Sequence, residues 1–161
     1  MSHDTILASG QRVIQTEIDA LQQLSETLGE SFLKSVEATV ACQGRIILAG
    51  VGKSGHVARK IAATLASTGT PSLYVHPTEA SHGDLGMITR GDVVIALSRS
   101  GETRELDDLL TYTRRFTIPL IGMTAVPDSA LGRASDICLT VPNAPEACDE
   151  TRAPTTSTTL M

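Results

Sequence analysis

The stretch "RIILAGVGKSGHVARKIAATLAS", residues 45 to 67, passes from a short apolar run through a Gly-x-Gly-x-x-Gly turn into a segment with helical spacing. A β-branched run, a glycine turn and a helix in this order are typical of one strand–helix unit of a parallel α/β protein. Gly50, Gly52 and Gly55 occupy the turn, where a backbone without side chains lets a phosphate approach closely. The stretch therefore predicts an α/β fold with an anion-binding turn.

Further along the chain, the same pattern repeats. Short apolar runs bounded by Gly, Pro, Asp or Ser occupy residues 72–76, 92–98, 119–125 and 136–142. Because these runs are apolar at nearly every position, they fit strands that are buried on both faces of a parallel sheet. Helical spacing at 55–67, 103–115 and 129–135 lies between them. The alternation predicts right-handed βαβ units and a three-layer αβα sandwich around a five-stranded parallel sheet.

The two ends of the chain differ from this pattern. Apolar residues recur with helical spacing over residues 5–42, and Gly29 divides them into a long helix and a short one. We expect residues 1–42 to form an N-terminal helical segment that packs on the domain or on a neighbouring subunit, and residues 43–161 to form the domain itself. Residues 155–159 are rich in capping hydroxyls, as at a helix N-terminus. We expect the domain to be cut short after this helix begins.

Composition excludes several classes of partner. The 161 residues carry 13 Lys and Arg against 18 Asp and Glu, a net charge of −5, with two Phe, two Tyr and no Trp. Such a chain lacks the basic stripe and stacking platforms of a nucleic-acid-binding protein. No apolar stretch approaches the roughly 20 residues of a membrane span, and no signal-peptide pattern opens the chain. Three cysteines without CxxC spacing favour a reducing compartment, so we expect a cytoplasmic protein.

The glycine run could hold several phosphate compounds. A Walker A loop would need glycine at position 47, which is Ile47. A dinucleotide fold expects an acid at the end of the second strand, but that strand ends at His76 and the nearest acid is Glu79. Glycines that serve only helix–strand packing would leave Lys53 and Ser54 between them unexplained. A smaller phosphate compound is therefore favoured.

A second loop strengthens this interpretation. The stretch "ALSRSGETRE", residues 96–105, places Ser98, Ser100, Gly101 and Thr103 between the third strand and a helix. Hydroxyls and backbone amides at a helix N-terminus bind phosphate by charge-assisted hydrogen bonds without a cation. A helix cap needs one hydroxyl, whereas three flank this turn. The loop predicts a phosphate site.

The stretch "GVGKSGHVARKIAATLASTGTPSLYVHPTEASHGDLGMIT", followed by "DVVIALSRSGET", resembles the sugar isomerase (SIS) domain and, within that superfamily, the arabinose 5-phosphate isomerases. The likeness extends from about residue 40 to Met161 and implies a flavodoxin-like five-stranded parallel sheet with a phosphosugar held in the Ser/Thr loop. It also implies interconversion of D-arabinose 5-phosphate and D-ribulose 5-phosphate through an enediol, which supplies a precursor of the sugar Kdo. No redox cofactor is required.

The resemblance also implies catalytic residues. Three positions match groups linked to catalysis in the family, namely Lys53, Glu105 and Glu146. Lys53 suits electrostatic stabilisation of an enediolate, and either carboxylate could be the base. From the residues alone, two simpler interpretations are open: Glu105 merely complements a helix dipole, and Glu146 is an ordinary acid in a loop. A fourth group of the family, a histidine, is expected beyond residue 161.

Further contacts follow from the same likeness. It implies that His76 can take zinc or another divalent metal, although His-x5-His is by itself a weak metal signature. The substrate-binding set it implies, together with the two loops above, is Gly52, Ser54, Gly69, Thr70, His82, Ser98, Ser100, Gly101 and Thr103.

Two other functions are compatible with the sequence. SIS domains also serve as non-catalytic phosphosugar sensors in regulators, and related isomerases act on other phosphosugars. Residues 1–42 show no basic recognition helix, and the Lys and Glu set would be surplus to a sensor. The long apolar-spaced helices predict a homo-oligomer, a dimer or tetramer as SIS domains commonly form, with sites between subunits.

Overall fold

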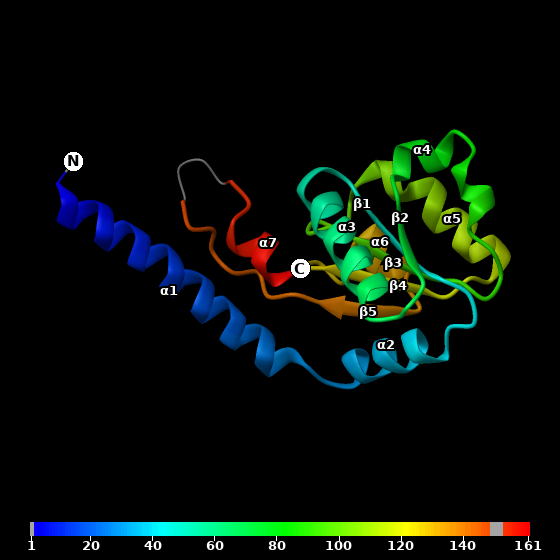
Figure 1. The fold of residues 1–161 in the computed structure, drawn as a ribbon, viewed down its shortest axis with the longest axis horizontal. Helices are drawn as coiled ribbons and strands as arrows, with labels where there is room; N and C mark the ends of the chain where they lie inside the picture. Colours follow the sequence, from blue (N-terminus) through cyan, green and yellow to red (C-terminus); the bar gives the residue numbers. More distant parts are fainter. Residues whose placement is uncertain (1, 149–152) are drawn as a thin grey trace.

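The computed structural model describes residues 2–148 and 153–161, and a five-stranded sheet lies at its centre. All strands are parallel and lie in the order β2-β1-β3-β4-β5 (Figure 1). Their bounds are β1 Ile46–Gly50, β2 Ser72–Val75, β3 Val93–Leu97, β4 Leu120–Thr124 and β5 Ile137–Thr140. Each strand lies within a run that the sequence predicted, so the flavodoxin-like parallel sheet is confirmed.

Helices cover both faces of the sheet and complete three layers. One face packs against α2 (Glu30–Ala41) and α3 (Gly52–Ser67), and the other against α4 (Pro77–Ser81), α5 (Asp107–Phe116) and α6 (Ala130–Ala134). Within β1, Ile46 and Leu48 belong to the hydrophobic core on the side of α2 and α3, whereas Ile47 and Ala49 belong to the core on the side of α4, α5 and α6. Burial on both faces explains why the strand is apolar at successive positions. Two short 3₁₀ turns, η1 (Asp84–Met87) and η2 (Arg104–Leu106), complete this part of the chain.

A buried carboxylate ties the amino ends of two central strands together. Asp92 is 1% exposed, and it accepts hydrogen bonds from the backbone N–H groups of Arg45 at 2.8 Å and Thr89 at 2.7 Å. The Thr89 hydroxyl and the Arg45 guanidinium add contacts at 3.1 Å and 3.4 Å. Burial acts to raise the pKa of Asp92, but these hydrogen bonds outweigh burial and hold the pKa below its ordinary value.

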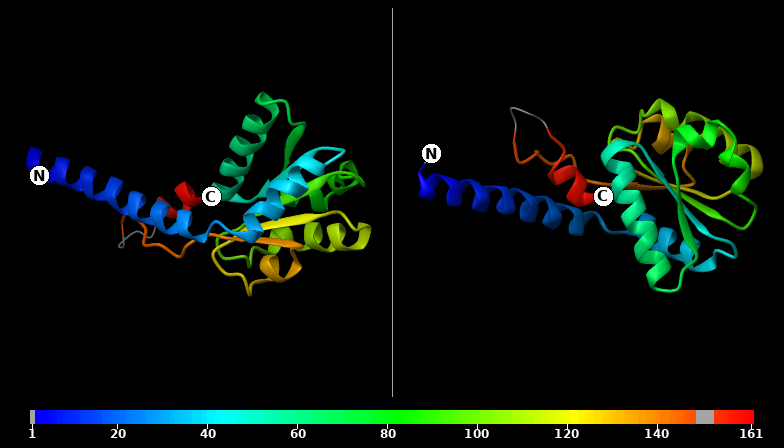
Figure 2. Two further views of the ribbon diagram at one scale, coloured as in Figure 1. Left: turned by 90° about the horizontal axis from the view of Figure 1, so that it is seen from below. Right: turned by 45° about the horizontal axis from the view of Figure 1, so that its top comes forward.

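The N-terminal segment forms the two predicted helices, which are separated at Gly29. The long first helix, α1 (His3–Thr27), extends away from the sheet (Figure 1 and Figure 2). Its buried residue is Ala20, which packs with the last helix, α7 (Thr156–Leu160), and with the end of β5. Another side of α1 carries four apolar side chains that are 41–65% exposed, Leu7, Ile14, Ile18 and Leu21. No helix among the described residues is long and apolar enough to cross a membrane.

Candidate active site

A cleft of about 970 Å³ opens at the carboxyl ends of β1 and β3. The connections of these two strands leave the sheet toward opposite sides, and this is the point where ligands bind in open parallel sheets. Three parts of the chain provide the walls: the glycine turn after β1, the Ser/Thr loop after β3, and described residues within 143–148 and 154–161. Six of the predicted site residues line the cleft, namely Lys53, Ser54, Ser98, Ser100, Thr103 and Glu146.

The glycine turn is held by a contact from the neighbouring strand. The Tyr74 hydroxyl donates a hydrogen bond to the Gly50 carbonyl at 2.7 Å, and the Arg59 guanidinium lies 3.9 Å from the centre of the Tyr74 ring. A Cβ at Gly55 would lie 2.7 Å from the Gly50 oxygen and 2.9 Å from the Tyr74 hydroxyl, so this position has no room for a side chain. The N-terminus of α3, with its unpaired N–H groups, is thereby fixed at the cleft beside Lys53.

The Ser/Thr loop is a preformed turn. The Ser98 side chain is buried; its hydroxyl lies 2.7 Å from that of Thr103 and accepts a hydrogen bond from the Gly101 N–H at 3.0 Å. Gly101 has a φ of +68°, and a Cβ there would collide with Ser129. These constraints require glycine at position 101 and hold the hydroxyls along the edge of the cleft.

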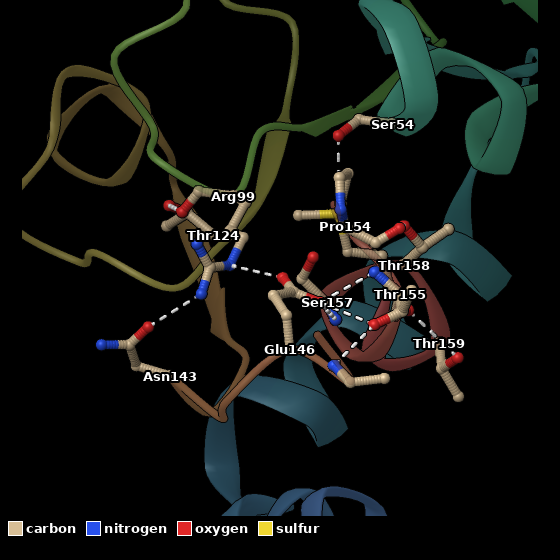
Figure 3. Close-up of polar contacts among 12 residues, drawn as sticks. Ser54, Arg99, Thr124, Asn143, Glu146, Pro154, Thr155, Ser157, Thr158 and Thr159 are labelled. Atoms are coloured by element: carbon tan, nitrogen blue, oxygen red, sulfur yellow. Dashed lines mark hydrogen bonds and ion pairs between the residues drawn. The ribbon is translucent and has the colours of Figure 1, made fainter. Parts of the chain in front are cut away.

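Glu146 enters the cleft from the segment after β5 (Figure 3). Its Oε2 accepts hydrogen bonds from the backbone N–H groups of Thr155 at 2.8 Å and Ser157 at 3.2 Å, and from the Thr155 hydroxyl at 3.2 Å. Burial acts to raise the pKa of Glu146, but the hydrogen bonds from Ser157 and Thr155 hold it below its ordinary value. The carboxylate is therefore ionised at neutral pH.

Two residues that sequence reasoning missed complete this wall. The Arg99 Nη2 donates a hydrogen bond to Asn143 Oδ1 at 3.0 Å, and its Nε lies 3.8 Å from Glu146 Oε1 (Figure 3). Lys53, Arg99 and Glu146 are the charged side chains among the residues that the structure places around the cleft. An arginine between two serines of a phosphate loop is a signal that could have identified Arg99; nothing in the sequence indicates its contact with Glu146.

The remaining predicted residues lie outside the cleft of this chain. Gly52 and Gly101 are in its two loops but do not line it. Glu105 is exposed in η2. Gly69 and Thr70 follow the C-terminus of α3, at the opposite edge of the sheet, because a helix of 16 residues is about 24 Å long.

His76 and His82 flank α4, beside the edge strand β2. His76 accepts a hydrogen bond at Nδ1 from the Thr78 N–H at 3.3 Å, which leaves one ring nitrogen for another partner. A protein metal site needs several ligands, and no three His, Cys, Asp or Glu side chains of the described residues come together as such a site. The residues that a single chain offers at His76 therefore do not fit a metal centre.

Comparisons with known proteins agree with this geometry. A model of the SIS domain family matches residues 39–161. The chain is 53% identical over 152 residues to the arabinose 5-phosphate isomerase KdsD of Pseudomonas aeruginosa, a match that covers 94% of this chain and 47% of that protein. It is 48% identical over 151 residues to KdsD of Escherichia coli K12, with 94% and 46% covered. The chain thus spans about half the length of the curated relatives it matches.

The fold is likewise similar to a solved structure, that of E. coli CFT073 c3406 in complex with arabinose 5-phosphate. The TM-score is 0.94 at 38% sequence identity, and the match covers 99% of this chain and 85% of that chain.

Proposed function

The chain belongs to the SIS domain family, and from this premise we propose that it is the phosphosugar-binding, catalytic domain of an aldose–ketose isomerase. Its proposed reaction interconverts D-arabinose 5-phosphate and D-ribulose 5-phosphate. The observation that carries the proposal is the meeting of an anion-binding turn, a hydroxyl-rich loop, a lysine and an ionised glutamate around one cleft. The names of its relatives and the arabinose 5-phosphate complex of a structural neighbour support the substrate.

The proposed chemistry moves one proton between neighbouring carbons. A base takes the proton from C2 of the aldose, an enediolate forms, and the proton returns to C1 while a hydroxyl proton moves between the two oxygens. The reaction is redox-neutral overall and needs no redox cofactor. Lys53 would stabilise the developing oxyanion, and the Ser98, Ser100 and Thr103 hydroxyls would bind the phosphate.

Glu146 is the carboxylate that the geometry favours as the base. It lines the cleft with Lys53, and its Oε2 is held by three hydrogen bonds that orient the side chain. Glu105, the alternative from the sequence, is exposed in η2 and does not line the cleft. A base must lie within hydrogen-bond reach of the proton that it abstracts, which supports Glu146.

We further propose that the protein is a homo-oligomer in which a second copy completes the site. The exposed apolar side of α1 supports an interface, because monomers seldom expose such a continuous apolar surface. Gly69, Thr70, His76 and His82 lie away from the cleft of their own chain and would face that of a neighbour. The pathway that we propose is Kdo biosynthesis in the cytoplasm, a compartment that the odd number of cysteines without CxxC spacing supports.

A product analysis tests the proposed reaction. The chain is incubated separately with D-arabinose 5-phosphate, glucose 6-phosphate and sedoheptulose 7-phosphate, and the sugars are followed by ¹³C NMR. We expect ribulose 5-phosphate from the first sugar and no conversion of the other two. Conversion of either other sugar in preference to the pentose would replace the substrate assignment, and tight binding without conversion of any sugar would favour a phosphosugar sensor.

A further inference from the structure

Arg99 occupies an unusual position between the phosphate loop and the carboxylate. It lies between Ser98 and Ser100, and its carbonyl accepts hydrogen bonds from the Ala125 N–H at 3.0 Å and the Thr124 hydroxyl at 3.1 Å. These bonds anchor the backbone to the end of β4. The side chain is 42% exposed, whereas that of Glu146 is 11% exposed. Within this pair, the guanidinium is the more exposed group, and its other hydrogen bond goes from Nη2 to Asn143 Oδ1 at 3.0 Å.

The two oxygens of Glu146 have different partners. Oε2 accepts three hydrogen bonds from Thr155 and Ser157, so its lone pairs are occupied by contacts within the protein. Oε1 lies 3.8 Å from Arg99 Nε, and the Ser157 hydroxyl also contacts the carboxylate. Oε1 is therefore the oxygen that could take a proton from a sugar, and a cation stands beside it. The separation is longer than a hydrogen bond, so the contact is electrostatic and readily exchanged.

A phosphate on the Ser/Thr loop would compete for this guanidinium. Arginine binds phosphate through two parallel hydrogen bonds, which are stronger than a single long contact to a carboxylate. We propose that Arg99 is a second phosphate ligand, and that its transfer to the bound phosphate frees Oε1 of Glu146 for proton abstraction. The phosphate group would then switch on the base as well as anchor the substrate. This inference rests on the proposed function.

Inorganic phosphate tests the coupling without catalysis. Its affinity is measured by titration calorimetry for the wild-type chain, Arg99→Gln, Glu146→Gln and the double variant. We expect Arg99→Gln to weaken phosphate binding about tenfold or more. Glu146→Gln should tighten phosphate binding, because the guanidinium of Arg99 no longer interacts with a carboxylate as well. This gain in affinity should be smaller in the Arg99→Gln background. Arg104→Gln is the control, since it removes the same charge from an exposed neighbour outside the cleft.

Two results overturn the proposal. One is an equal loss of phosphate affinity in Arg99→Gln and Arg104→Gln, because Arg99 would then contribute only its positive charge and no specific contact. The other is a gain in phosphate affinity from Glu146→Gln that is equal in the wild-type and Arg99→Gln backgrounds, because the two side chains would then act independently. The cycle does not require turnover, so it stands even if the chain proves inactive and the proposed isomerase fails.

A kinetic measurement tests the switch itself. In the wild-type chain, phosphite dianion should accelerate hydrogen exchange into unphosphorylated D-arabinose in D₂O, because it draws Arg99 away from Glu146. In Arg99→Gln, exchange without phosphite should exceed the wild-type rate, because no guanidinium then lies beside Oε1 of Glu146, and phosphite should have no effect. A purely structural role for Arg99 would slow exchange in the variant and leave the acceleration by phosphite intact, which would refute the switch.

Discussion

Glu146 and Glu105 are chemically identical, yet the structure gives them different surroundings. Glu146 lies in the cleft and is held by the N–H groups at the start of α7, whereas Glu105 is exposed in η2. We therefore predict that Glu146→Gln lowers kcat about 10²- to 10⁴-fold, the usual contribution of a general base. Glu105→Gln is the matched substitution, and steady-state kinetics should show it to be nearly neutral. The reverse order of effects would assign the base to Glu105.

Asp92 should make the stability of the fold depend on pH. Its folded pKa lies below its unfolded value, so it stabilises the protein above the unfolded carboxyl pKa of about 4. This stabilisation is lost as pH falls through the lower folded pKa. Asp92→Asn should cost about 2–3 kcal/mol of unfolding free energy at pH 7, since the amide carries no charge and replaces one of the two acceptor oxygens by a donor.

Urea unfolding at pH 7 and pH 3 checks this prediction. The deficit of Asp92→Asn should narrow at the lower pH, because the carboxyl of the unfolded wild-type chain is then mostly protonated and must release its proton on folding. Asp128→Asn, at an exposed position, should change stability by less than about 0.5 kcal/mol. A deficit that stays constant between the two pH values would show that the charge of Asp92 plays no part.

At this scale the sequence predicts residue types better than their contacts. Lys53, Ser98 and Glu146 are found in one cleft because each follows the carboxyl end of a parallel strand, and such ends share one edge of a sheet. The contact of Arg99 with Asn143 joins positions 44 residues apart. No local pattern encodes which long side chain reaches across a cleft, so this contact could not be predicted.

Among the elements, the start of α3 and the end of β1 lie in a close contact that has no room for an added side chain. Gly55→Ala would push a Cβ against the Gly50 carbonyl and the Tyr74 hydroxyl. We expect it to cost about 1–3 kcal/mol, as overpacking does, and to loosen the turn that holds Lys53. Urea unfolding measures the loss.

The same glycine-to-alanine substitution at Gly10 should have the opposite effect on the free energy of unfolding. Gly10 lies within α1 with nothing near its Cβ position, so Gly10→Ala should stabilise the helix by up to about 1 kcal/mol. If both alanines were to have the same effect on the unfolding midpoint, the loss at Gly55 could not be assigned to steric contact.

Strands were easier to predict than the short helices. Burial on both faces forces every residue of β1 and β3 to be largely apolar, which leaves a local signal. The five residues of α4 are too few for helical periodicity, and the helix begins at a proline held by neighbouring elements. Its position therefore depends on tertiary packing that a sequence window does not contain.

For the whole molecule, the apolar side of α1 determines the proposed assembly. Leu7, Ile14, Ile18 and Leu21 recur at helical spacing and remain exposed. We predict that Ile14→Glu dissociates the oligomer, because it places a charge in the centre of this row. Light scattering after size-exclusion chromatography measures the mass.

Gln23→Glu is the control for this prediction, since it adds the same charge on the opposite side of α1 and should leave the mass unchanged. A monomeric wild-type chain would contradict the assembly. So would an Ile14→Glu variant with the mass of the wild type, because the interface would then lie elsewhere.

The proposed function requires this cleft to move a proton between C2 and C1 of a sugar phosphate. The most direct measurement is an NMR time course with D-arabinose 5-phosphate in D₂O for the wild-type chain, Lys53→Ala and Lys60→Ala. We predict deuterium at C1 of the ribulose 5-phosphate formed by the wild-type chain and Lys60→Ala, whose lysine lies on the same helix but outside the cleft. Lys53→Ala should be slower by about 10²-fold or more. Binding of the sugar phosphate by the wild-type chain without deuterium exchange would contradict the claim.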